Sequence, residues 1–385
     1  MSYLFPTYSR WEVEPDQAGG SVIIDKDGKR YLDFTSGIGV CNLGHRPASV
    51  QEAITSQLNR FWHVSNLFIQ EEQENAAKRL ADSAKMDCVF FANSGAEANE
   101  AAIKLARKAT GRKKIITFEN SFHGRTFATM AATGQDKIKM GYGPMLETFV
   151  YLPFNDIEAV KNEVDDKTAA VMLEVVQGEG GIHIGEHDFL KEVGQLCQEN
   201  GALLIIDEIQ TGIGRTGKPF AFQHFQLTPD IVTSAKGLGS GLPIGAVIGK
   251  KELAQFFGPG SHGSTFGGNP LAIAAATATM EIIFQAEFLE EVEKKSAYLF
   301  EQISKEIKGI PDILNSRQLG MMIGLETSID LPILLQELRN HGLLALPAGG
   351  NVLRLLPPLT VTKTEIDEAI HILQSVLRNY STAAV

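Results

Sequence analysis

Short runs of apolar residues alternate with longer amphipathic segments through the middle of the chain. Apolar runs end at Ala92, Phe118, Leu173 and Asp207, and another extends from Ile231 to Ala235. Uninterrupted apolar strands separated by helices are typical of a mostly parallel sheet that is covered on both faces. The pattern therefore predicts an α/β fold, with helices flanking a mostly parallel sheet.

Two segments between these runs predict helices with defined ends. From Glu97 to Ala109 alanine and leucine recur on one face, and Gly111 follows the last turn. From Phe189 to Cys197 apolar residues again recur at helical spacing, and Gly201 is the expected stop. Apolar residues three and four positions apart, followed by glycine, indicate an amphipathic helix and its C-terminal end.

The two ends of the chain carry a different pattern. Ser21–Phe34 consists of two strand-like runs around the Asp27-Gly28 turn, which predicts a hairpin. Beyond residue 285 a charged helix precedes a β-rich stretch and a last helix. We expect a small α+β domain formed from both chain ends and a large domain between them. The expected boundaries are 1–50 for the first segment of the small domain, 51–285 for the large domain and 286–385 for the second segment.

Composition narrows the class of protein. Of 385 residues, 44% are hydrophobic and 21% charged, which is ordinary for a soluble protein, and the net charge of −11 argues against a nucleic-acid-binding surface. Cys41, Cys88 and Cys197 are too widely spaced for a disulfide framework or a zinc site. We find no signal-peptide pattern and no apolar run near the roughly 20 residues of a membrane helix. A cytoplasmic protein without a bound metal is expected.

Lys236 and Asp207 are the first candidates for chemistry. Lys236 follows the Ile231–Ala235 run and precedes a glycine-rich loop, whereas Asp207 ends a neighbouring apolar run. A lysine can form a Schiff base with an aldehyde, and a carboxylate can pair with a protonated ring nitrogen. Pyridoxal phosphate (PLP) requires both groups, and Gln210 could donate to its phenolic oxygen.

Further motifs fit a phosphate and carboxylate ligand, although each alone fits an ordinary structural role at least as well. Asn93-Ser-Gly-Ala-Glu97 opens a helix, where free amides and the helix dipole favour an anion. Phe122 could stack on a planar ring, and Arg125 could receive a carboxylate. Arg354 is a charge inside an apolar strand, so it needs a partner or a ligand.

Gly212-Ile-Gly-Arg-Thr-Gly217 offers a competing class, a nicotinamide-dependent oxidoreductase, because it matches the G-x-G-x-x-G fingerprint. That fingerprint needs its first glycine in the turn directly after the strand and a helix opening within the motif. Here Asp207–Thr211 intervene and Lys218-Pro219 follows. We therefore favour PLP over a nicotinamide cofactor, and over a catalytically silent binding protein.

Six segments together resemble the class III (ω-amino) aminotransferases of PLP fold type I. They occur in that family's order at compatible spacings: Asn93–Glu97, Phe122–Arg125, Gln177–Gly180, Asp207–Gln210, Ser234–Gly237 and Ser264–Gly268. The resemblance implies that Lys236 holds PLP as an internal aldimine and that Asp207 supports the ring nitrogen. It also implies a wider set of cofactor contacts: Gly95, Ala96, Phe122, Glu208, Ile209, Gln210 and, from the second subunit of a homodimer, Thr265.

The resemblance also implies the roles of the substrate-binding residues. Arg125 would bind the carboxylate of the ω-amino donor, with Ser264 nearby, and Arg354 would bind the α-carboxylate of 2-oxoglutarate or glutamate. Glu179 would cover Arg354 in one half-reaction and release it in the other.

The sequence leaves the donor open among acetylornithine, ornithine, succinylornithine, succinyldiaminopimelate and 4-aminobutyrate. The compact length and the segments His63–Phe68, Ala131–Lys137 and Leu355–Thr362 are most similar to the acetylornithine-using branch of the family. No tyrosine occurs in Ser65–Leu67, where ornithine-using relatives place one for the free α-amino group. The preferred expectation is therefore acetylornithine with 2-oxoglutarate, in arginine synthesis.

Overall fold

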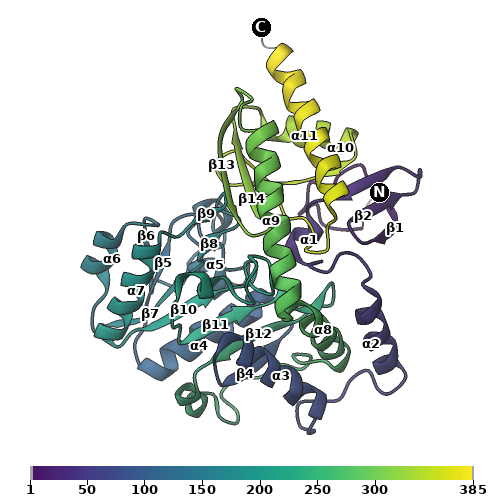
Figure 1. Ribbon diagram of the computed structural model, residues 1–385. Helices are drawn as coiled ribbons and strands as arrows, with labels where there is room; N and C mark the ends of the chain where they lie inside the picture. The colour runs from purple at the N-terminus through teal and green to yellow at the C-terminus, as the bar shows by residue number, and fades with distance from the viewer. Residues whose placement is uncertain (1–2, 384–385) are drawn as a thin grey trace.

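The computed structural model describes residues 3–383 and is built around a seven-stranded sheet (Figure 1). In spatial order the strands are β4 (Cys88–Ala92), β12 (Gly245–Gly249), β11 (Ile231–Ser234), β10 (Leu203–Asp207), β7 (Thr168–Leu173), β5 (Lys114–Phe118) and β6 (Phe149–Leu152). Only β12 pairs antiparallel with its neighbours among these described strands. The predicted mostly parallel sheet is confirmed.

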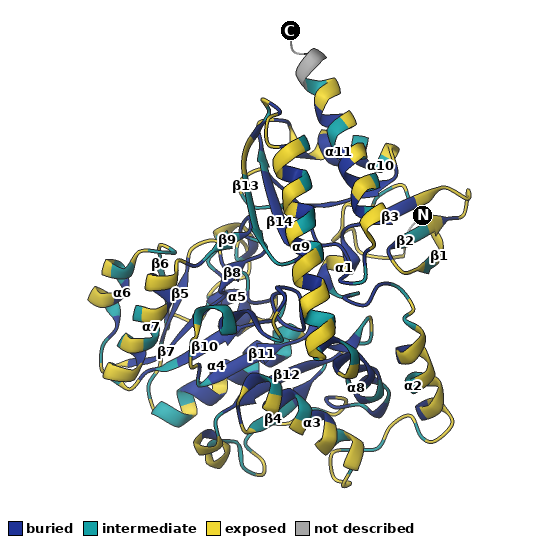
Figure 2. Ribbon diagram, in the orientation of Figure 1, coloured by how far each residue is buried: buried dark blue, intermediate teal, exposed yellow. Residues whose placement is uncertain are grey.

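Helices cover both faces of this sheet (Figure 2). Side chains alternate along each strand, so neighbouring residues of one strand meet different helices. On β10, Ile205 belongs to an apolar cluster with α4 (Gly95–Thr110). Ile206, the next residue, lies in a separate cluster with α7 (His187–Asn200). Both helices end at a left-handed glycine, Gly111 and Gly201, as their sequence patterns predicted.

Both chain ends contribute to smaller sheets beside the large one. The N-terminal hairpin is confirmed, since β2 (Val22–Asp25) pairs antiparallel with β3 (Arg30–Asp33). β3 also pairs in parallel with β15 (Leu343–Leu344), so the first and last parts of the chain share one sheet. The other strands of these sheets are β1 (Pro15–Gly19), β13 (Ile313–Leu319), β14 (Met322–Thr327), β16 (Leu346–Ala348) and β17 (Val352–Leu355). The domain boundaries remain a prediction.

The other described elements connect or flank these sheets. The helices are α1 (Ser36–Gly39), α2 (Ala48–Leu58), α3 (Glu71–Ala84), α5 (Phe127–Ala132), α6 (Ile157–Glu163), α8 (Pro270–Ile283), α9 (Ala286–Glu306), α10 (Leu331–Asn340) and α11 (Lys363–Ala383). The short strands β8 (Val176–Gln177) and β9 (His183–Ile184) form a separate pair. Within residues 3–383 no single helix passes a length and hydropathy test for crossing a membrane, although α8 and α9 pass together as a pair bent by 71°.

The Gly212–Gly217 segment forms successive turns, and no helix opens within it. Its Arg215 is completely buried and donates to Pro357 O at 2.5 Å, Met321 O at 3.3 Å and Asn42 Oδ1 at 2.7 Å. Burial lowers the pKa of Arg215 to about 9. The segment thus ties the large sheet to both ends of the chain, which accounts for its conformation without a dinucleotide.

Removing the Arg215 side chain should therefore destabilise the fold. Arg215→Ala strands buried acceptors on three segments and leaves a cavity, so we expect the free energy of unfolding to fall by about 3 kcal/mol or more. Urea unfolding followed by circular dichroism measures this. Arg30→Ala, which breaks an exposed ion pair with Glu368, is the control and should cost at most ~1 kcal/mol. Equal losses in the two variants would contradict the assigned role.

Candidate active site

The carboxyl ends of β5, β7, β10 and β11 open into a cavity of about 440 Å³. Parallel strands bring these ends to one edge of a sheet, and ligands of such folds bind there. Most of the predicted site residues line this cavity: Gly95, Ala96, Phe122, Arg125, Glu179, Asp207, Ile209, Gln210 and Lys236. Motifs separated by more than a hundred residues are therefore brought together.

Asp207 lies at the end of β10 on the α4 side and is held by three donors. Its Oδ2 atom meets His123 Nδ1 at 2.7 Å and accepts from Asn99 Nδ2 at 2.8 Å, while Oδ1 accepts from the Ile209 amide at 3.0 Å. Although burial favours a neutral imidazole, the contact with Asp207 raises the pKa of His123 above its usual value. A fixed carboxylate is therefore presented at the base of the cavity.

Lys236 follows β11 in the left-handed region, with φ of +43°. Its side chain is half-buried and lines the cavity. Burial lowers the pKa of Lys236 below its ordinary value, although Glu179 acts in the opposite direction. A lowered pKa increases the fraction of neutral amine, which is the nucleophilic form.

The N-terminus of α4 forms another wall. Ser94 Oγ accepts from the Glu97 amide at 3.2 Å, and the first intrahelical bond runs from the Ala98 amide to Ser94 O. The amides of Gly95 and Ala96 therefore precede that bond, where a helix leaves donors for an anion. A Cβ on Gly95 would lie 2.7 Å from Ile209 Cδ1, so only glycine allows this approach.

Phe122 and Arg125 form a third wall, in the loop after β5. The Phe122 ring is half-buried, and the Arg125 guanidinium lies 5.8 Å from its centroid in a cation–π contact. The Arg125 side chain is exposed at the rim of the cavity. An aromatic face is thus available inside and a positive charge at the entrance.

Glu179 and Arg354 form an ion pair beside Lys236. Arg354 NH1 donates to Glu179 Oε1 at 2.6 Å and to Gln210 Oε1 at 3.1 Å. Burial favours the neutral acid, but Arg354 and Lys236 lower the pKa of Glu179 below its ordinary value. Arg354 itself is buried in β17, and its Nε atom has no partner among the described residues. The buried Arg354 guanidinium thus contacts the cavity lining through Glu179 and Gln210, and another acceptor could take the place of either.

Glu208, Ser264 and Thr265 do not line this cavity. Glu208 points to the opposite face of β10 and accepts from Thr211 Oγ1 at 2.5 Å and the Phe222 amide at 2.7 Å. The Glu208 side chain therefore has a structural role, and its cofactor contact stays a prediction. Ser264 accepts from Asn93 Nδ2 at 3.1 Å, next to the cavity, and Thr265 is exposed.

The sequence prediction also missed residues that belong to the site. His123 lies inside the Phe122–Arg125 motif, but no role was predicted for it. Asn99 lies on the inner face of α4 and contacts both His123 and Asp207. Glu174 directly follows the apolar strand β7, just as Asp207 ends β10, and it lines the cavity. The same signal, a carboxylate after a buried strand, could have identified it.

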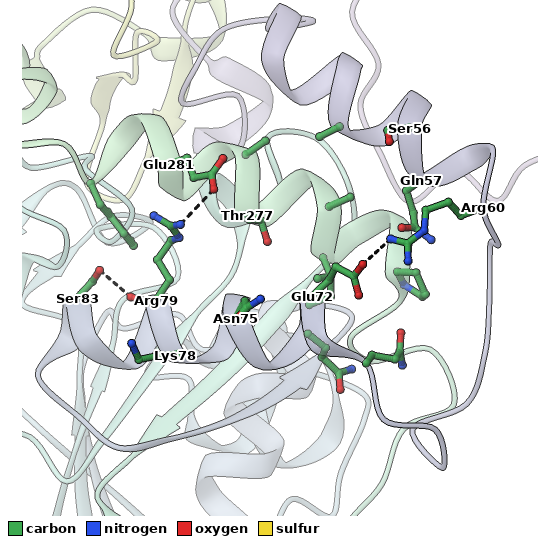
Figure 3. Close-up of a pocket in the computed structure, with 18 of the residues that line it drawn as sticks. Ser56, Gln57, Arg60, Glu72, Asn75, Lys78, Arg79, Ser83, Thr277 and Glu281 are labelled. Carbon is green, nitrogen blue, oxygen red and sulfur yellow. Dashed lines mark hydrogen bonds and ion pairs between the residues drawn. The ribbon is translucent and has the colours of Figure 1, made fainter.

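A larger groove of about 730 Å³ lies elsewhere, between α2, α3 and α8 (Figure 3). Exposed ion pairs cross it, from Arg60 to Glu72 and, at 3.1 Å, from Arg79 to Glu281. None of the predicted site residues is among the described residues that line it. The chemistry is therefore assigned to the smaller cavity at the sheet edge.

A family model described as aminotransferase class-III matches residues 6–377. The chain belongs to the class III aminotransferases, which are PLP-dependent enzymes. It is 58% identical to the acetylornithine aminotransferase of Bacillus subtilis (strain 168) over 383 residues, 99% of each chain. It is 55% identical to that of Halalkalibacterium halodurans over 384 residues, 100% of each chain.

Solved structures agree with this assignment. The ornithine aminotransferase of Toxoplasma gondii ME49 superposes with a TM-score of 0.95 at 30% identity, over 99% of this chain and 94% of that one. The N-acetylornithine aminotransferase of Stenotrophomonas maltophilia K279a superposes with a TM-score of 0.85 at 33% identity, over 98% of both chains. The predicted fold and enzyme class are confirmed.

The cavity fits PLP by the chemistry of its donors. Four groups surround one space, and each suits a different part of the cofactor. They are a lysine with a lowered pKa, a fixed carboxylate, an aromatic face and a helix N-terminus. Gly95 allows the N-terminus of α4 to pack closely against Ile209, which also lines the cavity. Lys236, Asp207, Phe122 and the amides of Gly95 and Ala96 are therefore the residues that would hold it.

Replacement of Lys236 tests this arrangement. Without the ε-amine no covalent link to the cofactor forms, so Lys236→Ala should lose the visible absorption of the lysine-bound cofactor and about 10³-fold or more in turnover. Spectra of purified protein with added PLP measure the first effect. Lys250→Ala, which breaks an ion pair with Asp230 outside the cavity, should keep the absorption. A Lys236→Ala protein with an unchanged spectrum would contradict the role.

Proposed function

We propose that the enzyme transfers the 5-amino group of N²-acetyl-L-ornithine to 2-oxoglutarate, as a step of arginine synthesis. The observation that carries the proposal is the Glu179–Arg354 ion pair beside Lys236. Its Arg354 NH1 and Glu179 Oε1 atoms lie 2.6 Å apart. A carboxylate site that can be covered and uncovered suits an enzyme that alternates between an ω-amine and glutamate. The full-length relatives that act on acetylornithine support the choice of donor.

Lys236 and Asp207 carry the proton chemistry in this proposal. PLP, when bound, supplies an electron sink for the charge that develops on the reacting carbon. Asp207 keeps a proton on the ring nitrogen, since its carboxylate is fixed by His123 and Asn99. With PLP bound, Lys236 Nζ would take the proton from the reacting carbon of the substrate and would deliver it to the cofactor carbon that keeps the amino group.

Glu179 and Arg354 distinguish the two half-reactions. The carbon that reacts in acetylornithine bears no carboxylate, so Glu179 covers the Arg354 guanidinium. The reacting carbon of glutamate bears one, and this α-carboxylate replaces Glu179 on Arg354 in a charge-assisted contact. Gln210, which already accepts from Arg354 at 3.1 Å, steadies the guanidinium while its partners exchange.

The cavity rim selects the donor. Arg125 is exposed at the entrance and binds the donor's α-carboxylate. Ser264 lies close by, because its hydroxyl accepts a hydrogen bond from Asn93, which lines the cavity. Val40, Leu242 and Ile244 add apolar lining. Burying a charged α-ammonium against apolar walls costs more than burying a neutral amide, which favours the acetylated donor over ornithine.

Glu179→Ala tests two proposals together: that the glutamate α-carboxylate replaces Glu179 on Arg354, and that acetylornithine is the preferred donor. Stopped-flow rates of cofactor reaction with acetylornithine, ornithine and glutamate are compared separately in both proteins. The wild type should prefer acetylornithine to ornithine. The variant should shift selectivity towards glutamate by about tenfold or more, because Arg354 stays uncovered, and a tenfold change corresponds to about 1.4 kcal/mol.

Glu179→Gln is the matched control, since it keeps the shape and loses the charge, and it should give an intermediate shift. Selectivity between glutamate and acetylornithine that is the same in all three proteins would overturn the exchange. Faster reaction of the wild type with ornithine than with acetylornithine would overturn the donor.

We further propose a cytoplasmic homodimer with shared active sites. The Cys41, Cys88 and Cys197 thiols are free, in keeping with a reducing compartment. Large apolar side chains gather on exposed loops, which indicates a surface covered by another chain. Examples of these exposed side chains are Tyr3, Phe5, Tyr8, Trp62, Leu67, Phe68, Ile69, Met140, Tyr142 and Phe266. Thr265 lies next to Phe266 on such a loop, where it can reach a neighbour's phosphate.

A mixture of two defective variants tests the shared site. Thr265→Asp places a carboxylate against the phosphate, so PLP affinity should fall about a hundredfold. Co-expression with Lys236→Ala should restore activity, because one site of a mixed dimer then has both native residues. Thr265→Ser is the control and should bind PLP normally. A fully active monomer in analytical ultracentrifugation, or no recovery in proven mixed dimers, would contradict the proposal.

A further inference from the structure

Glu174 and Asp207 leave the sheet as neighbours. The parallel register pairs Ile206 of β10 with Leu173 of β7, so the next residue of each strand is a carboxylate. Alternation puts Glu174 on the same face as Met172, which belongs to the α4 cluster. Asp207 meets Asn99 of α4 on that face. The two carboxyl groups therefore share one side of the sheet and one cavity.

Glu174 is fixed against the backbone of the aromatic wall. Its Oε2 atom accepts from the Phe122 amide at 3.0 Å, and the residue is only 6% exposed. It lines the cavity together with Phe122, His123 and Asp207. One carboxyl group thus holds the segment that carries both the aromatic face and the partner of Asp207.

The surroundings of Glu174 favour a proton on it. Two carboxylates at one site repel each other, and Asp207 already has three donors while Glu174 has one amide. Burial and the charge of Asp207 raise the pKa of Glu174 to about 7, although His123 opposes this. The charged groups that face it from the neighbouring elements are His123 after β5, Asp207 after β10 and Lys236 after β11. Glu179 and Arg125 line the cavity further around, and Arg354 is paired with Glu179.

We propose that Glu174 is a positioning residue of the active site, which fixes Phe122 through its amide and sets the charge felt by the His123–Asp207 pair and Lys236. The proposal rests on PLP binding in this cavity, which the proposed function requires. When Glu174 is protonated, Asp207 is the only one of these two strand-end carboxyl groups that carries a negative charge. Ionised Glu174 adds a second negative charge, which strengthens the hold of Lys236 and His123 on their protons.

Glu174→Gln and Glu174→Ala separate the two roles. Glutamine keeps an acceptor for the Phe122 amide and cannot ionise, whereas alanine removes both functions. In Glu174→Gln we expect PLP affinity within about threefold of wild type. The pH midpoint of the cofactor's spectral change should fall by about one unit, because the second negative charge is gone. Glu174→Ala should show the same shift and about tenfold weaker PLP binding.

The measurements are spectral titrations of the holoenzyme with pH and with PLP, in the absence of substrate. An unchanged midpoint in Glu174→Gln overturns the electrostatic role. Equal PLP affinity in the glutamine and alanine variants overturns the positioning role. Because no amino donor is present, an error in the proposed substrate leaves both tests intact, whereas loss of PLP binding in the wild type would refute the proposed function itself.

Discussion

The buried contact between His123 and Asp207 is the interaction on which the rest of the site depends. A carboxylate taken out of water without partners costs several kcal/mol, so Asp207 can occupy the end of β10 only because donors surround it. His123 also donates its amide to Thr133 and receives Asn99 at its carbonyl. This one residue therefore joins β10, α4 and the start of the loop that carries Phe122 and Arg125. Glu174 completes the arrangement from β7 by holding the Phe122 amide.

The strand and helix pattern predicted this edge of the sheet well, because parallel strands place their carboxyl ends together whatever the loops do. The same pattern could have separated Asp207 from Glu208. Side chains alternate along β10, so Asp207 follows Ile205 to the α4 face and Glu208 follows Ile206 to the other. The strand pattern cannot predict the position of Thr265 in this way, because its expected contact is with a second subunit and a single sequence gives no geometry for such a contact. The buried contacts of Arg215 were likewise hidden, since they join segments more than a hundred residues apart.

The overall fold does not select the amino donor. The chain superposes on an ornithine aminotransferase with a TM-score of 0.95 and on an N-acetylornithine aminotransferase with 0.85, at similar identities of 30% and 33%. A backbone shared by both activities leaves the choice to a few side chains at the rim. The groups available for that choice are Arg125, the apolar lining near Val40, and the Glu179–Arg354 pair. In the proposed function the first two discriminate among donors, whereas the Glu179–Arg354 pair distinguishes the two half-reactions.

The wall at Val40 stores backbone strain. From Ser36 to Gly39 four consecutive residues have positive φ, between +46° and +73°, and two of them, Ser36 and Ile38, carry a side chain. Such conformations cost roughly 1–2 kcal/mol for each non-glycine residue, so the surroundings must impose them. Asp33 accepts from the Ser36 amide at 3.1 Å, and Ser36 Oγ donates to Leu356 O at 2.6 Å. The turn is therefore held by the N-terminal hairpin and the strand that carries Arg354, and its Gly39 approaches Gln210. Strand ends build the floor of the cavity, and contacts from both chain ends hold the turn that places Val40 in its wall.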